Sequence, residues 1–180
     1  MKKSFFLFLS FLIYTNCLSA QSTLTPVDAD SKVNFAIKNF GIKTKGDFKG
    51  LKGNIKFYTA NPAASAFDIT VDAGTIDTDN ESRDEHLRKA EYFDVATYKT
   101  ISFVSTKVTL SSTAGRYYMF GNLTIKGVTK PVEFGFSASP KNGGYVFDGE
   151  FKINRRDFGV GESSVSLSDN LTVTLSVFAR

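Results

Sequence analysis

Hydrophobic and polar residues alternate along most of the chain after residue 30. The alternation falls into eight runs, at residues 33–37, 51–57, 67–73, 101–110, 117–125, 132–138, 145–153 and 171–177. Side chains at every second position of a strand share one face, so each run predicts a β-strand with one apolar face. Turn-forming pieces such as "PKNGG" at 140–144 separate the runs and indicate antiparallel hairpins.

Eight antiparallel strands with one apolar face must either stack as two sheets or close on themselves. The pattern favours a barrel over a sandwich, because closure removes exposed strand edges, and an eight-stranded barrel can enclose one small ligand. The alternation changes phase between Phe48 and Leu51, which predicts a bulge or sharp bend at Gly50 within a long strand. We therefore expect an all-β protein built on an eight-stranded antiparallel barrel.

One charged segment interrupts the alternation, "RDEHLRKAEYFD" at residues 83–94. Ser82 and Glu85 have the spacing of a capping box, and Arg88 and Lys89 lie toward the other end, where the helix dipole favours positive charge. The segment predicts one short helical connection of two to three turns.

The only histidine of the chain, His86, lies in this segment. A zinc site needs more imidazole or thiolate ligands than one histidine supplies, and a serine nucleophile would need an elbow sequence that is lacking. A helix histidine near the barrel mouth is the favoured interpretation. We expect no catalytic residue, no metal and no cofactor.

Residues 1–20 have the pattern of an export signal. Lys2 and Lys3 precede an apolar stretch at 5–14, which is too short to span a bilayer, and small residues follow it. Cleavage after Ala20 would leave residues 21–180 as a single domain, periplasmic or secreted, with no membrane anchor expected. Cys17 leaves lipoprotein processing open as an alternative.

The remaining charge is nearly balanced. Without Lys2 and Lys3 the chain has 20 basic and 18 acidic residues, a net charge of +2, and the basic residues are scattered. We therefore expect no nucleic-acid partner. Residues 21–180 contain no cysteine, so the exported domain must rely on packing rather than disulfides.

Phenylalanine is unusually frequent, with 18 residues in the chain and no tryptophan. Large apolar residues occupy the predicted inner face at Phe35, Ile37, Phe57, Phe67, Ile69, Phe103, Met119, Phe134, Phe136, Phe147 and Phe151. Such a set either fills a barrel or lines a long apolar tunnel, since pockets for apolar ligands have such walls. The pattern alone does not choose between them.

The segment "INRRDFGVG" at 153–161 carries two adjacent arginines. Arg155 and Arg156 could hold an anionic group through paired hydrogen bonds. The alternative is a turn in which Asp157 pairs with an arginine and Gly159 supplies a positive φ.

Four segments, at residues 27–57, 83–105, 121–134 and 153–161, resemble in order and spacing the YceI-like family of polyisoprenoid-binding proteins. One departure is Lys99 after Tyr98, where the family usually has Tyr-Pro, and it concerns a turn rather than the fold. The resemblance implies an extended, lipocalin-like barrel of eight antiparallel strands with the tail of an amphiphile in its pore. It also implies an exported bacterial protein whose ligands are isoprenoid-type lipids or fatty acid derivatives.

We therefore expect a carrier or scavenger of a long-chain amphiphile, with a homodimer possible. The apolar set above would form the lipid-binding wall. The headgroup would meet charged residues at the mouth, namely Arg83, Asp84, His86, Arg155, Arg156 and Asp157, with the aspartates holding the guanidinium groups in place. A lipid-modifying enzyme that uses the His86 region is the alternative. An outer-membrane barrel is a third possibility, disfavoured by the lysines and aspartates between the apolar positions.

Overall fold

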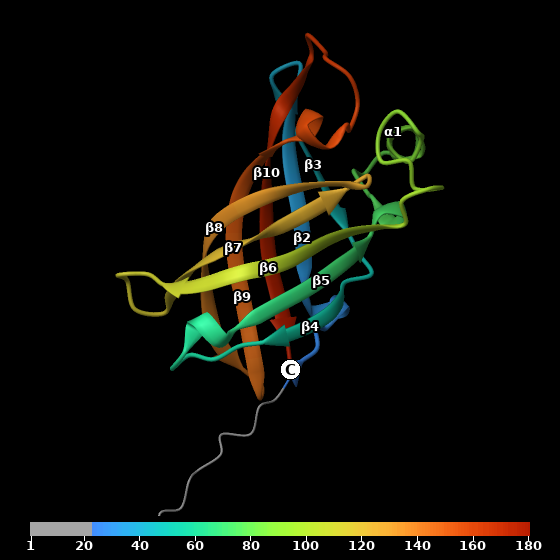
Figure 1. The fold of residues 1–180 in the computed structure, drawn as a ribbon. Coiled ribbons are helices and arrows are strands. Elements are labelled where there is room, and N and C mark those ends of the chain that lie inside the picture. The colour runs from blue at the N-terminus through green and yellow to red at the C-terminus, as the bar shows by residue number, and fades with distance from the viewer. Residues whose placement is uncertain (1–22) are drawn as a thin grey trace, which may run out of the picture.

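The computed structural model describes residues 23–180 as one antiparallel sheet of ten strands, in the order β1-β4-β5-β6-β7-β8-β9-β10-β2-β3 (Figure 1). The strands are β1 (Thr23–Leu24), β2 (Lys32–Asn39), β3 (Ile42–Phe48), β4 (Lys52–Lys56), β5 (Ala66–Asp72), β6 (Thr100–Leu110), β7 (Arg116–Ile125), β8 (Val128–Lys141), β9 (Gly144–Asn154) and β10 (Leu167–Ala179). Helical segments are α1 (Glu81–Leu87) and the 3₁₀ turns η1 (Asp28–Asp30), η2 (Pro62–Ala64), η3 (Ala73–Thr75) and η4 (Arg155–Phe158).

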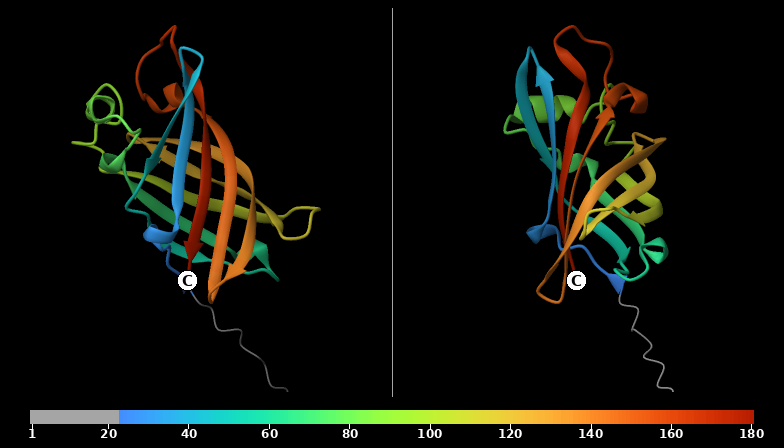
Figure 2. Two further views of the ribbon diagram at one scale, coloured as in Figure 1. Left: turned by 180° about the vertical axis from the view of Figure 1, so that it is seen from behind. Right: turned by 90° about the vertical axis from the view of Figure 1, so that its left-hand side faces the viewer.

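The sheet curls around a common interior (Figure 2), and backbone hydrogen bonds tie each of its two edges to another segment of the chain. The N-terminal segment pairs with β4 through β1 and then with the end of β10, where Thr25 and Arg180 exchange hydrogen bonds of 2.9 and 3.1 Å. At the other edge, Asp47 of β3 and Asp77 exchange hydrogen bonds of 2.9 and 3.1 Å. These contacts hold the sheet in its curled form.

The predicted all-β antiparallel architecture with one short helix is confirmed, but the strand number is ten rather than eight. Each predicted run corresponds to one of the strands β2 and β4–β10, although Leu51, Phe57 and Ala73 lie just outside the strand ends. Two strands, β1 and β3, were not predicted from the sequence, and each has a physical explanation. The first, β1, has only two residues. In β3, the residues paired with the inward-facing residues of β2 are Thr44, Gly46 and Phe48. The ring of Phe35 on β2 occupies the space above Gly46. The strand therefore shows almost no apolar alternation of its own.

Of the two irregular positions predicted from the sequence, the hairpin turn at 140–144 is present and the bulge at Gly50 is not. At the predicted 140–144 turn, Asn142 and Gly143 have φ values of 45° and 78° and connect β8 to β9, which confirms the hairpin. Gly50, with φ of 73°, does not bulge a long strand. It lies in the break between β3, which pairs with β2, and β4, which pairs with β5, so the prediction of one bent strand was wrong.

Helix α1 begins two residues earlier than the capping-box pattern indicated. The side chain of Asn80 accepts a hydrogen bond from the Arg83 amide at 2.9 Å, so Asn80 is the N-cap and Ser82 lies inside the helix. Of residues 23–180, no helix is long and apolar enough to cross a membrane.

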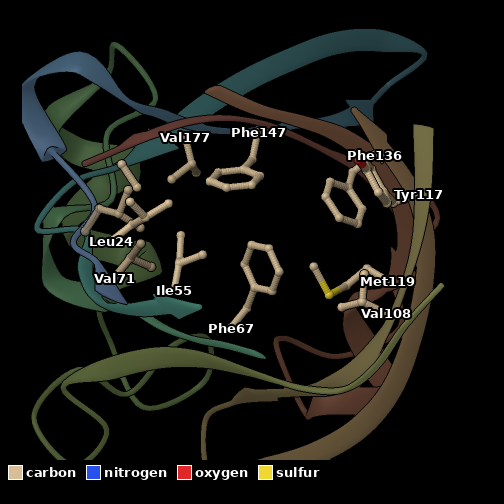
Figure 3. Close-up of a cluster of buried hydrophobic side chains, with 12 residues drawn as sticks. Leu24, Ile55, Phe67, Val71, Val108, Tyr117, Met119, Phe136, Phe147 and Val177 are labelled. Carbon is tan, nitrogen blue, oxygen red and sulfur yellow. The ribbon is translucent and has the colours of Figure 1, made fainter. Parts of the chain in front are cut away.

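An aromatic cluster fills the barrel at the end nearest the C-terminus. Figure 3 shows the buried side chains of this core pointing inward from the surrounding strands, among them Phe67, Tyr117, Phe136 and Phe147. Phe57 joins them, with its ring centroid 5.2 Å from that of Tyr117 and 5.1 Å from that of Phe147. This packing closes one end of the barrel. A second apolar cluster, around Phe158 and Ile153, lies beside η4.

Candidate functional site

The barrel interior contains a cavity of about 460 Å³. Ten of the eleven residues predicted as an apolar wall line it: Phe35, Ile37, Phe67, Ile69, Phe103, Met119, Phe134, Phe136, Phe147 and Phe151. Phe57 is not in the wall, because it lies beyond the last residue of β4 and packs in the closed end. The cavity size falls within the range of ordinary small-molecule sites.

Further wall residues come from the same inward alternation and from the charged connection. They are Leu123 and Ile125 of β7, Leu171, Val173, Leu175 and Val177 of β10, and Leu87, Tyr92 and Phe93 at and after α1. The strand residues could have been identified from their inward positions in the period-two alternation alone. The residues around α1 could not, because only the fold brings that connection over the cavity.

Glycines on neighbouring strands fix how the phenylalanine rings lie. A Cβ atom on Gly121 would overlap the ring of Phe103, and a Cβ on Gly149 would come within 3.1 Å of the Phe134 ring. Phe134 in turn stacks on Phe151, with centroids 4.7 Å apart. The rings therefore lie close against the strands, which leaves the centre of the barrel as open cavity.

Polar residues line the cavity at the end away from the aromatic cluster, and we call this rim the mouth. They are Asn39 and Thr44 of the β2–β3 hairpin, Arg83 and His86 of α1, and Arg155, Glu162, Ser164 and Ser166 at and after η4. His86, Glu162 and Ser164 are also exposed, so the cavity reaches the surface between these three segments.

Arg83 is held at the mouth through Thr78. Its Nε donates to Thr78 Oγ1 at 2.7 Å, and its Nη2 donates to the Thr78 carbonyl at 2.6 Å. Asp84 is buried and accepts a hydrogen bond from the Thr78 amide at 3.0 Å, so it positions the arginine only indirectly. Within residues 23–180, Nη1 of Arg83 has no hydrogen-bond partner.

Arg155 is oriented differently, and its side chain is only 4% exposed. It donates to the backbone carbonyls of Val160, Glu162 and Ser168 at 2.8, 2.8 and 3.1 Å. Its remaining partner is the carboxylate of Asp169, at 2.8 Å. Arg155 therefore organises the segment between η4 and β10, and most of its donors are already used.

The aspartate that the sequence suggested as the arginine's partner is not the one that binds it. Asp157 and Arg156 are exposed and lie outside the cavity wall, and Arg156 Nη1 is 3.8 Å from Asp169. Gly159 has φ of 67°, as the turn interpretation required. Asp169 carries no sequence signal for this role, since it is 14 residues from Arg155 and meets it only through the fold.

His86 lies at the mouth with its ring edge-on to Tyr92, at a centroid distance of 4.9 Å. Its imidazole makes no hydrogen bond to any residue in the described part of the chain. Among residues 23–180 no group of three or more histidine, cysteine, aspartate or glutamate side chains could hold a metal ion. No nucleophile or proton relay is assembled around it there.

Comparison with known proteins places this barrel in a family. The "YceI-like domain" profile matches residues 24–179, which is essentially the whole described chain. The chain belongs to the YceI-like family. Protein YceI of Salmonella agona (strain SL483) is 32% identical, over 98% of this chain and 97% of that protein. A UPF0312 protein of Ectopseudomonas mendocina (strain ymp) is also 32% identical, over 93% and 91%.

Solved structures show the same YceI-like fold. The crystal structure of Burkholderia cenocepacia BcnA has a TM-score of 0.82 and 26% identity, covering 86% of this chain and 99% of that one. A polyisoprenoid binding domain from Saccharophagus degradans, implicated in plant cell wall breakdown, has a TM-score of 0.70 and 14% identity, covering 89% and 98%. The family predicted from the four sequence segments is thereby confirmed.

Proposed function

We propose that this YceI-like protein is an exported carrier or scavenger that holds one long-chain amphiphile in its barrel. The observation that carries the proposal is a cavity of about 460 Å³ with a mainly apolar wall, one aromatic-filled end and a group of polar residues at the mouth. Each methylene buried in such a space contributes about 0.8 kcal/mol, whereas an unpaired polar headgroup would oppose binding there. The tail therefore enters and the headgroup stays at the mouth.

The ligand class that fits is an isoprenoid-type lipid or a fatty acid derivative. The binding named for the Saccharophagus degradans domain supports the isoprenoid class, and the apolar wall suits either tail. Export rests on the signal pattern of residues 1–20, which lie outside the described residues. We infer binding rather than catalysis, because the cavity offers an apolar wall and no assembled catalytic set among residues 23–180.

The purified protein is expected to carry lipid from the cells that produce it. The apolar wall favours any available long tail, so native mass spectrometry should show a mass above that of the protein. Organic extraction of the same sample should then release an isoprenoid or acyl lipid. Repeated extraction without lipid, together with no binding of isoprenoid or fatty acid probes, would falsify the carrier proposal.

Headgroup selection is assigned here to Arg83. Arg83 lines the cavity and its Nη1 is free, while two hydrogen bonds to Thr78 hold the guanidinium in place. Arg155, the other arginine of the wall, has most of its donors engaged by the protein itself. Of the three arginines predicted for the mouth, Arg83 is thus the one that both lines the cavity and keeps a donor free.

The variant Arg83→Gln should weaken binding of anionic-headed lipids by roughly tenfold, about the free energy of one charge-assisted hydrogen bond. Neutral-headed lipids of the same tail length should bind nearly as before, because the wall is unchanged. Fluorescence titration with a matched pair, such as a fatty acid and its alcohol, measures the difference.

Lys89→Gln is the matched control, since Lys89 is exposed, close to α1 and absent from the cavity wall. It should leave both titrations unchanged. Equal losses for the acid and the alcohol in Arg83→Gln would show that Arg83 only supports the fold.

A further inference from the structure

Three large apolar side chains stand exposed at the rim of the mouth, and we call them the rim patch. Phe40 is 80% exposed, Ile42 72% and Val165 fully exposed. The first two belong to the β2–β3 hairpin and the third to the loop before β10. The Phe40 amide donates to the Ser166 carbonyl at 2.8 Å, which holds the two segments together. Figures 1 and 2 show both tips side by side at the end of the molecule opposite the C-terminus.

The fold itself gives no reason for a phenylalanine at position 40. Asn39 pairs with Ile42, so Phe40 and Gly41 form a two-residue hairpin turn with φ values of 49° and 77°. A bulky residue is disfavoured in this left-handed region, where asparagine or glycine is preferred. The β8–β9 hairpin of the same chain has Asn142 at the equivalent place, with φ of 45°. Phe40 therefore strains the backbone and buries little within the protein.

Three exposed lysines flank the rim patch on the same hairpin: Lys38, Lys43 and Lys45. Lys38 lies directly opposite Lys43 in the strand register, an arrangement that like charges make unfavourable for the sheet. The sequence from 38 to 46 contains no acidic residue. Lys43 and Lys45 share a surface pocket with Asp47, Asp77 and Asp79, whereas Lys38 does not line it. The hairpin thus presents an apolar tip with three lysines behind it, none of which is held in a salt bridge among the described residues.

We propose that the rim patch and these lysines dock the mouth of the barrel onto an anionic phospholipid bilayer. Apolar side chains that enter the headgroup region, with basic residues behind them, are the features of interfacial membrane binding. Asn39 and Thr44 flank the hairpin tip and Ser164 and Ser166 flank Val165, and all four line the cavity. Docking would therefore set the cavity opening against the lipid surface. That a lipid then passes into the cavity rests on the proposed function, whereas docking itself does not.

The experiment measures co-sedimentation of the purified protein with vesicles of phosphatidylglycerol and phosphatidylcholine in equal parts. The variant Phe40→Asn/Ile42→Thr/Val165→Thr should lower the partition coefficient on the order of a hundredfold, because three apolar side chains no longer enter the interface. The variant Lys38→Gln/Lys43→Gln/Lys45→Gln should lower it by roughly tenfold or more and weaken its salt dependence. Vesicles of phosphatidylcholine alone should bind the parent protein weakly.

A matched control removes exposed apolar surface elsewhere. Val104, Leu110 and Tyr118 are 46%, 63% and 48% exposed and lie away from the mouth on β6 and β7, so Val104→Thr/Leu110→Thr/Tyr118→Thr should sediment like the parent. Phe40→Asn relieves a strained turn position, so the rim variant should melt no lower than this control.

The outcomes separate docking from lipid carriage. Uptake of a dissolved fluorescent fatty acid should be unchanged in the rim variant, while its transfer from vesicles slows. Vesicle binding that is the same in the rim variant and the parent overturns the proposal. It is also overturned if the rim variant changes only from dimer to monomer in sedimentation velocity, since the patch would then be an interface between two copies. Rim-dependent vesicle binding by a protein that takes up no lipid would support docking and reject the carrier function.

Discussion

Replacing Val173 with aspartate should abolish ligand retention while the barrel still folds. Val173 lines the cavity from the middle of β10, opposite Phe35 on one side and Phe151 on the other. It is only half-buried, so the introduced carboxylate can be hydrated when no ligand is bound. A bound tail would remove that water and leave the charge against methylenes. The cost of several kcal/mol corresponds to a loss of affinity on the order of a hundredfold or more. Titration with a fluorescent fatty acid at neutral pH measures it.

Two controls make this result specific to the cavity. Val173→Thr keeps the shape of the side chain and adds no charge, so it should bind within roughly tenfold of the parent. The introduced aspartate has an ordinary pKa of about 4, which the apolar surroundings raise. Lowering the pH below the pKa of this carboxyl group should therefore restore binding, because the group becomes neutral. Equal affinity of the aspartate and threonine variants at neutral pH would show that tails do not pass Val173.

The position along the barrel matters as much as the direction of the side chain. Phe147 also faces the cavity but is buried in the aromatic cluster, with its ring 5.2 Å from that of Phe67. A charge at that position would disrupt the core and the ligand site together. Val173 lies outside the aromatic cluster and is half-buried at the margin of the second cluster, so a charge there can still be hydrated in the empty barrel.

The period-two pattern predicted most of the fold because each inward position usually holds a large apolar residue. It failed at β3, where a phenylalanine from the neighbouring strand covers a glycine and the apolar surface belongs to the partner. Such a strand is visible only when both strands are seen together. The pattern also could not place Phe57, because parity shows which face a side chain takes and not how far along the barrel it lies.

The mouth was less predictable than the wall because its hydrogen bonds join segments distant in the sequence. The segment 153–161 suggested two arginines free to bind an anion, yet Arg155 is held by three backbone carbonyls and by Asp169. Arg83 comes from the other charged segment and keeps a donor free. The two arginines therefore have different roles. They differ in how deeply the side chain is buried and in how many of its N–H donors are already bonded to the protein.

The variant Arg155→Met should destabilise the protein by about 3 to 5 kcal/mol, the usual cost of removing one partner from a buried charged pair. The methionine can fill the space, but it leaves the carbonyls of Val160, Glu162 and Ser168 without their donor. The carboxylate of Asp169 also loses its partner, although its 36% exposure lets water offset part of that loss. Urea denaturation of lipid-free protein measures the change. Arg155→Lys should recover only a fraction of the stability, because an ammonium group cannot reach all four acceptors.

The neighbouring arginine provides the matched control for this effect. Arg156 is 46% exposed and its Nη1 lies 3.8 Å from the same aspartate, so Arg156→Met should cost less than about 1 kcal/mol. The two substitutions remove the same charge one residue apart, and only burial and donor number separate them. If Arg155→Met unfolds at the same urea concentration as Arg156→Met but loses anionic lipids selectively, then Arg155 holds the headgroup. In that case its contacts with the loop are incidental to stability, and the headgroup site extends from α1 to η4 across the mouth.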